Sequence, residues 1–141
     1  MIHLVKLAVG VKDPGHLAEI QRRRAEADPP LRHQTRSFPK RAAELTDGGS
    51  IYWVITGAVL VRQRVLDVIE DVWDDGTTCT GLVLDPTLVR VEARPMKPFQ
   101  GWRYLAPDDA PADLPEGGRT SGIEQLPPAL RRDLRALALL P

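Results

Sequence analysis

The residues of this sequence best suited to chemistry are aromatic and basic side chains that lie close together. Three of the seven aromatic residues fall within residues 99–104, with Lys97 just before them and Arg103 among them. Single-stranded nucleic acid is held by basic grooves that contact phosphates and by aromatic rings on which bases stack. The cluster therefore predicts either a surface that stacks on a flat ligand or a corner where aromatic side chains close the core.

Other cations and aromatic residues extend this candidate surface. The candidate phosphate contacts are Arg36, Lys40, Arg41, Arg62, Arg64 and Arg103, and the candidate stacking residues are Tyr52, Trp102 and Tyr104. Successive residues of a strand point to opposite faces, so Trp53 rather than Tyr52 is expected in the core. Arg62 and Arg64 are expected on one strand face, either as a basic stripe or as ordinary solvated surface.

Motifs for catalysis or metal binding are weaker. Gly48-Gly49-Ser50 lacks the lysine of a phosphate loop and is predicted to form a turn. The histidines have no metal-ligand spacing; His33 is the most interesting of them because Arg32 and Arg36 lie beside it. Cys79 is the only cysteine, so neither an internal disulfide nor a zinc-ligand pair of cysteines is possible. The sequence therefore predicts no metal site and no cofactor.

Length and charge narrow the class of protein. A chain of 141 residues is expected to form one domain. Its net charge of zero argues against a general nucleic-acid coat, but residues 31–64 and 90–103 carry more basic than acidic residues. This distribution predicts either a basic face on a neutral protein or ordinary solvated surface. No stretch is long and apolar enough to span a bilayer, and a single cysteine suits a reducing compartment, so we expect a cytoplasmic protein without membrane contact.

Hydrophobic patterns predict short strands, many turns and few helices. Strands are expected at residues 2–11, 51–55, 68–73, 79–84 and 88–93, and a further apolar run begins at Ala58. Helices are expected from Asp13-Pro14 to about residue 27 and at residues 40–45, separated by a basic connector at 31–39. Turns are expected at Asp74-Asp75-Gly76, as a hairpin, and at Asp85-Pro86. The predicted fold is α+β: a small, strongly bent mixed or antiparallel sheet or pseudo-barrel, with peripheral helices.

The end of the chain has a different character. Residues 106–122 are rich in proline, glycine and acid and are expected to form a loop. Leucines at positions 126, 130, 134 and 137 then predict an amphipathic helix. Its leucine face is expected to dock on its own domain, or alternatively to contact a protein partner or a second copy of the chain. We therefore expect a single α+β domain at residues 1–114, with a loop and a packed helix at 115–141.

Several motifs in order resemble one known family. They are Met1-Ile2-His3-Leu4-Val5-Lys6-Leu7, Pro39-Lys40-Arg41-Ala42, Asp47-Gly48-Gly49-Ser50-Ile51-Tyr52-Trp53-Val54-Ile55, Val61-Arg62-Gln63-Arg64, Leu82-Val83-Leu84-Asp85-Pro86 and Phe99-Gln100-Gly101-Trp102-Arg103-Tyr104-Leu105. Together they resemble the bacterial domain-of-unknown-function family 1489, over residues 1 to about 114, with the tail after residue 117 outside the resemblance. That family implies no activity and no catalytic residue. The strand pattern is also similar, at the level of fold, to the PUA and ASCH pseudo-barrels, which often bind RNA or modified bases between strands and a helix.

Three classes of function follow from these patterns. The favoured one is a domain that binds RNA or a nucleotide-like ligand through the aromatic residues and arginines. A protein-interaction module that uses the terminal leucine face or the aromatic cluster is the main alternative. A small enzyme acting on an anionic metabolite, with His33, Arg36 and Arg103 in its pocket, is the third and least favoured class.

Overall fold

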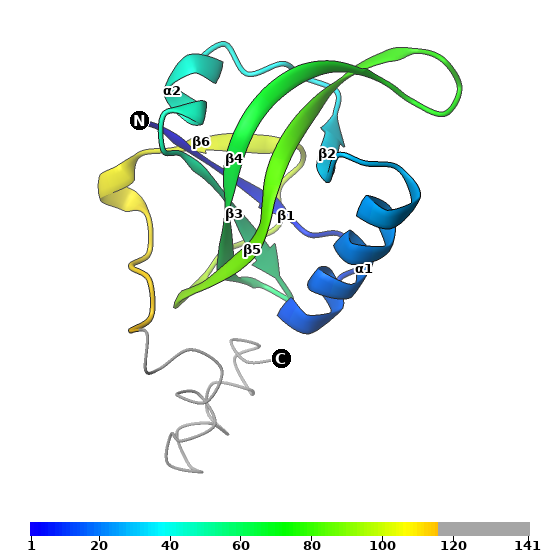
Figure 1. The fold of residues 1–141 in the computed structure, drawn as a ribbon. Coiled ribbons are helices and arrows are strands. Elements are labelled where there is room, and N and C mark those ends of the chain that lie inside the picture. The colour runs from blue at the N-terminus through cyan, green and yellow to red at the C-terminus, as the bar shows by residue number, and fades with distance from the viewer. Residues whose placement is uncertain (116–141) are drawn as a thin grey trace.

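A mixed sheet of six strands forms the centre of the computed structural model, which describes residues 1–115 (Figure 1). The strands are β1 (His3–Leu7), β2 (Arg32–Thr35), β3 (Ser50–Ile55), β4 (Ala58–Val72), β5 (Thr78–Pro95) and β6 (Trp102–Leu105), and the helices are α1 (Pro14–Ala27), α2 (Ala42–Thr46) and a 3₁₀ turn, Pro107–Asp109. Their order across the sheet is β2-β5-β4-β3-β1-β6. Neighbouring strands are antiparallel except β1 and β3, which are parallel.

This architecture confirms the predicted α+β class with a mixed sheet and peripheral helices. The sheet is open, because its edge strands β2 and β6 do not pair with each other. It is therefore not a closed barrel, and the similarity to PUA and ASCH barrels stays a prediction.

Helix α1 begins where local sequence chemistry predicts. The Asp13 carboxylate accepts a hydrogen bond from the His16 backbone N–H at 2.7 Å, and Pro14 occupies the first helical position. The helix ends at Ala27, before two prolines that cannot continue it. The short helix predicted at residues 40–45 is likewise confirmed, as α2.

Strands β4 and β5 form one long hairpin. The predicted turn at Asp74-Asp75-Gly76 is confirmed: the Trp73 N–H donates to the Thr77 carbonyl at 2.8 Å, and Gly76 has a φ of +88°. The predicted turn at Asp85-Pro86 is wrong, because β5 runs through it. A shift in register between Gln63 and Val65 leaves three β5 residues opposite one β4 residue there, and such a bulge accommodates a proline that has no N–H to donate.

The predicted connector at residues 31–39 is also wrong in part, because it contains the edge strand β2. Its sequence, Arg-His-Gln-Thr, has no hydrophobic alternation. The strand pairs with β5, and Arg32 and Gln34 both donate to the Asp71 carboxylate on β4. Long-range polar contacts, rather than an apolar face, hold this strand in place.

Both faces of the sheet are covered by apolar side chains. On one face Leu17 of α1 packs with a cluster that includes Leu4, Ile51, Trp53 and Leu82. The other face has a second cluster, formed by Val5, Tyr52, Val54, Val59 and Val91, with Met96 and Phe99 against it. We call these the helix face and the far face.

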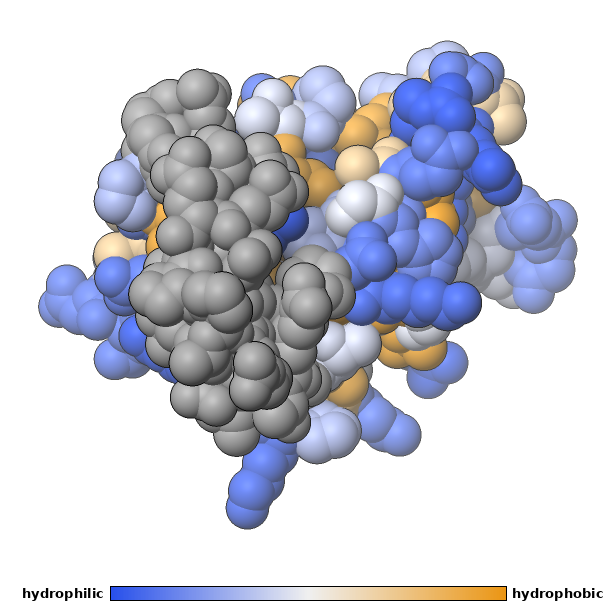
Figure 2. Space-filling view, turned by 90° about the horizontal axis from the view of Figure 1, so that it is seen from below, coloured by the Kyte–Doolittle hydropathy of each residue, from blue (hydrophilic) through white to orange (hydrophobic). Residues whose placement is uncertain are grey.

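No helix among residues 1–115 is long and apolar enough to cross a membrane. One side of the molecule carries mostly hydrophilic residues with smaller hydrophobic areas between them (Figure 2).

The predicted helix at residues 126–137 lies outside the described residues, so it and the predicted division at residue 114 stay predictions.

Candidate ligand-binding cleft

A cleft with a volume of about 220 Å³ lies between α1 and the helix face of the sheet. Its walls come from β1 and the loop after it, from α1, from β2, and from single residues of β3 and β5. Most of the lining is aliphatic, with side chains such as Leu17, Ile20 and Leu84. Trp53 of β3 closes the inner end and is only 3% exposed.

The polar groups of this cleft are predominantly basic. Lys6, Arg24, Arg32 and His33 line it, and no aspartate or glutamate of the described residues does. Arg32 is engaged by Asp71 and by Asp28. The side chains of Lys6 and Arg24, in contrast, have no ion pair or hydrogen bond within residues 1–115. Two unpaired cations beside an apolar wall are suited to an anion that carries an apolar or flat body.

His33 is the most unusual group of the cleft. Its Nε2 atom is buried and has no hydrogen-bond partner among the described residues. Its ring meets the Trp53 ring edge-on, with the two ring centroids 5.2 Å apart. Burial and the positive charges of Lys6 and Arg24 lower the pKa of His33 to about 4, so the imidazole is neutral at pH 7. A buried nitrogen without a partner is costly, and a ligand that bonds to it would remove that cost.

A fully paired polar network lies at the floor of the cleft. The side-chain amides of Gln21 and Gln63 bond each other in both directions, at 2.9 and 2.7 Å. Gln63 also accepts from Trp53 Nε1 at 3.1 Å and donates to the Asp85 carbonyl at 2.8 Å. This network ties α1 to the sheet and fixes the Trp53 ring. The polar side chains at the floor of the cleft therefore have hydrogen-bond partners, whereas His33 Nε2 has none among the described residues.

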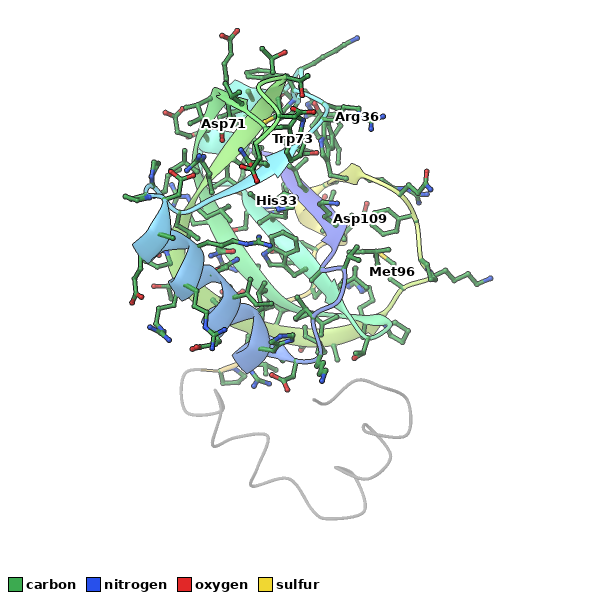
Figure 3. The ribbon with its side chains drawn as sticks, turned by 90° about the vertical axis from the view of Figure 1, so that its right-hand side faces the viewer. His33, Arg36, Asp71, Trp73, Met96 and Asp109 are labelled. Atoms are coloured by element: carbon green, nitrogen blue, oxygen red, sulfur yellow. The ribbon has the colours of Figure 1, made fainter. Side chains whose placement is uncertain are left out.

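Strand register divides the residues predicted from the sequence between the two faces. Lys6 pairs with Trp53 on one side and with Trp102 on the other, and side chains of paired residues share a face. Val5 pairs with Tyr52 and with Arg103, which places both on the far face. Figure 3 shows His33, Asp71 and Trp73 near β2, whereas Met96 and Asp109 lie on the side away from α1.

Four of the predicted residues are on the far face. Tyr52 is 4% exposed within the second cluster, so its ring cannot stack on a base, and the expectation that it does is wrong in this structure. Arg62 binds the Asp113 carboxylate through two hydrogen bonds of 2.6 and 2.7 Å and donates to Ser50 Oγ. The Arg103 guanidinium lies over the Phe99 ring, 4.5 Å from its centroid. Arg64 is exposed and pairs with Ser50, on the same side of β4 as Arg62.

Four others lie on the helix face or at its border. Trp102 and Tyr104 pack edge to face with centroids 5.0 Å apart, and both are half-buried. Trp102 Nε1 donates to the Ser37 carbonyl at 3.2 Å, and the Tyr104 hydroxyl accepts from the Arg41 backbone N–H at 2.9 Å. Arg41 lies over the Tyr104 ring and pairs with Glu44, which leaves Arg36 as the predicted cation beside Trp102.

Some cleft residues were not predicted. Lys40 is exposed just before α2 and lines no part of the cleft, whereas Lys6 and Arg24 do. The available signal for Lys6 was a charge inside an otherwise largely apolar strand, directly after three residues that are buried. Arg24 carried no signal beyond its place in the last turn of a helix, where a cation is ordinary.

The fold and cleft define an α+β domain with a basic, largely apolar pocket between a helix and a mixed sheet. The chain belongs to the family described as "Protein of unknown function (DUF1489)", whose model matches residues 4–140. This confirms the family predicted from the sequence. The expectation that the tail after residue 117 falls outside the family is wrong, because the match extends through it. No match was found among curated proteins or among solved structures.

Proposed function

We propose that this protein binds RNA or a nucleotide-like ligand, with an anionic group of the ligand held by Lys6 and Arg24 in the cleft. The observation that carries the proposal is a pair of cations, beside the buried His33 Nε2, that have no partner among residues 1–115, in a cleft that no acid of these residues lines. Backbone phosphates are the anions such cations bind in nucleic acids. The position agrees with what the PUA and ASCH resemblance implies, a ligand between strands and a helix, and an RNA ligand agrees with a cytoplasmic location.

Each group of the cleft has a distinct role in this proposal. Lys6 and Arg24 contact phosphate as charges, while the aliphatic wall contacts the flat part of the ligand. The neutral His33 imidazole can hydrogen-bond a base edge or a hydroxyl group through Nε2 once the side chains that cover this atom move aside. The far-face arginines are not needed, because Arg62 is paired with Asp113 and Arg103 lies on the opposite face of the sheet from the cleft.

Replacing the cleft cations is expected to weaken binding and its salt dependence together. We expect Lys6→Met and Arg24→Met each to lower the affinity for a labelled single-stranded RNA about tenfold. The slope of log affinity against log salt should fall by about 0.7 for each phosphate contact that is lost. Fluorescence anisotropy titrations at several salt concentrations measure both quantities.

Two neighbouring cations provide matched controls. Arg23 lies next to Arg24 in helix α1, but it is exposed, pairs with Glu19 at 3.0 Å and does not line the cleft. Lys12 is also exposed and does not line the cleft. We expect Arg23→Met and Lys12→Met to leave both the affinity and the salt slope close to those of the natural protein. Equal losses in the cleft variants and the control variants would contradict a specific phosphate site and indicate general charge attraction.

A further inference from the structure

We infer that the ligand is a single strand of nucleic acid several nucleotides long, which follows the helix face from Trp73 through the cleft to Trp102. This inference rests on the proposed function and narrows it to one class of ligand. It comes from two further hollows, one contiguous with the cleft and one lined by the sheet neighbour of Lys6, that each contain a tryptophan and a cation.

The first continuation lies between the end of α1 and the tip of the β4–β5 hairpin. It is a hollow of about 380 Å³ that shares Arg24, Arg32 and His33 with the cleft, so the two are contiguous. Trp73 lines it from the hairpin and is 36% exposed. Figure 3 shows Trp73 and His33 close to each other beside β2. A nucleic-acid strand that leaves the cleft past Arg24 therefore meets an aromatic ring that is partly open to solvent.

The second continuation lies on the other side of Lys6. It is a hollow of about 550 Å³ lined by Arg36 and Ser37, which follow β2, and by Trp102 with Gln100 and Gly101. Trp102 is the direct sheet neighbour of Lys6, so one residue of this hollow lies on the strand next to a residue of the cleft, although the two share no lining residue. The Arg36 side chain has no ion pair or hydrogen bond among the described residues. This end thus repeats the combination of an aromatic ring and an available cation.

The size of the cleft favours a strand of nucleic acid, rather than a free nucleotide, as the ligand. Pockets that enclose a drug-sized molecule have volumes of about 300–1,000 Å³. The cleft, at about 220 Å³, is smaller than this range. A ligand larger than the cleft extends into the neighbouring hollows, where stacking on Trp73 and Trp102 is available, as in other sites for single strands.

Acidic groups set the limit of the path at the hairpin. Asp28 lines the hollow beside Trp73, and its carboxylate and that of Asp71 are both engaged by Arg32. Beyond Trp73 the turn carries Asp74 and Asp75, and Asp75 is held in place by hydrogen bonds from Thr77. Phosphate is repelled there, so the bound strand ends near Trp73.

The test is the dependence of affinity on ligand length, measured with the full chain. Homopolymeric RNA of roughly one to nine nucleotides, with a duplex of the longest length as competitor, covers a plausible site size. We expect affinity to rise at least tenfold between the mononucleotide and a length of roughly six nucleotides, and then to level off. The duplex should compete poorly, because its bases are already stacked.

Variants at the two ends separate this inference from the proposed function. We expect Trp73→Ala and Arg36→Met each to weaken the longer RNA about tenfold and to leave mononucleotide binding unchanged. The control Phe38→Ala removes an aromatic side chain that is 51% exposed but lines none of the three hollows, and it should change neither.

The outcomes are distinguishable. A mononucleotide that binds as tightly as the longer RNA, with no effect of Trp73→Ala, overturns the extended strand but leaves the proposed function standing. Equal competition by the duplex also overturns it. If no length binds at low salt, both the inference and the proposed function fail.

Discussion

Replacing Gly49 with alanine is expected to lower the free energy of unfolding by about 4 kcal/mol. A Cβ atom at this position would lie 2.1 Å from the Ile2 carbonyl oxygen and 2.3 Å from the Leu45 carbonyl oxygen. Both are backbone atoms at a junction where Gly49 N–H bonds the Leu45 carbonyl and Ile2 N–H bonds the Glu44 carbonyl. Relief of the clash requires α2 or the start of β1 to move, which breaks these bonds. Urea denaturation, with the midpoint compared at a constant slope, measures the loss.

Gly10 provides the control for this variant. It has a φ of +77°, so alanine is strained there, but no heavy atom of the part of the chain that the structure describes lies within 4 Å of the added Cβ. We expect Gly10→Ala to cost about 1–2 kcal/mol, the penalty for a left-handed conformation alone. A Gly49→Ala protein that is as stable as Gly10→Ala would contradict the close packing of α2 against β1. A Gly49→Ala protein that fails to fold while Gly10→Ala folds would agree with it.

Local signals explain the parts of the fold that the sequence predicted well. The Asp13-Pro14 cap and the Asp74-Asp75-Gly76 turn each depend on residues a few positions apart, and both are confirmed. Strand β3 could be predicted because its six residues are apolar, aromatic or β-branched apart from Ser50. In each case the residues that determine the conformation are also the residues that adopt it.

The parts that were missed depend on distant partners. Strand β2 is held by Asp71, 39 positions beyond Arg32. Strand β5 continues through Pro86 because the bulge it needs depends on its register with β4. Neither contact can be inferred from the residues of the strand alone, since Arg-His-Gln-Thr and Asp-Pro both suit loops equally well.

The candidate site was predicted in part for the same reason. Proximity in the sequence placed Arg103 with Trp102 and Tyr104, but in a strand these neighbours point to opposite faces. Lys6 joins Trp53 and Trp102 only because β1 lies between β3 and β6 in the sheet. Aromatic and basic composition therefore indicated the class of ligand, while the choice of face needed the strand order.

Protonation of His33 is expected to make the protein less stable below pH 6.5. The pKa of His33 is about 4 in the folded protein, because of burial and the charges of Lys6 and Arg24, against about 6.5 when unfolded. Between these values the unfolded chain binds a proton that the folded protein does not, so stability falls as the pH falls. The effect is absent above pH 6.5, and its full size near pH 4 is about 3 kcal/mol.

The variant His33→Gln isolates this contribution, because glutamine does not titrate and keeps a polar side chain in the cleft. We expect the natural protein to lose about 3 kcal/mol more than the variant between pH 7 and pH 4, in urea denaturation at each pH. Other groups whose pKa values are shifted, such as His3, titrate in both proteins and cancel in the difference. Introducing Lys6→Met into the natural protein should reduce the loss, because the positive charge of Lys6 is one cause of the lowered pKa. Parallel curves for the natural protein and His33→Gln would mean that His33 is solvated, and would remove the buried imidazole from the proposed site.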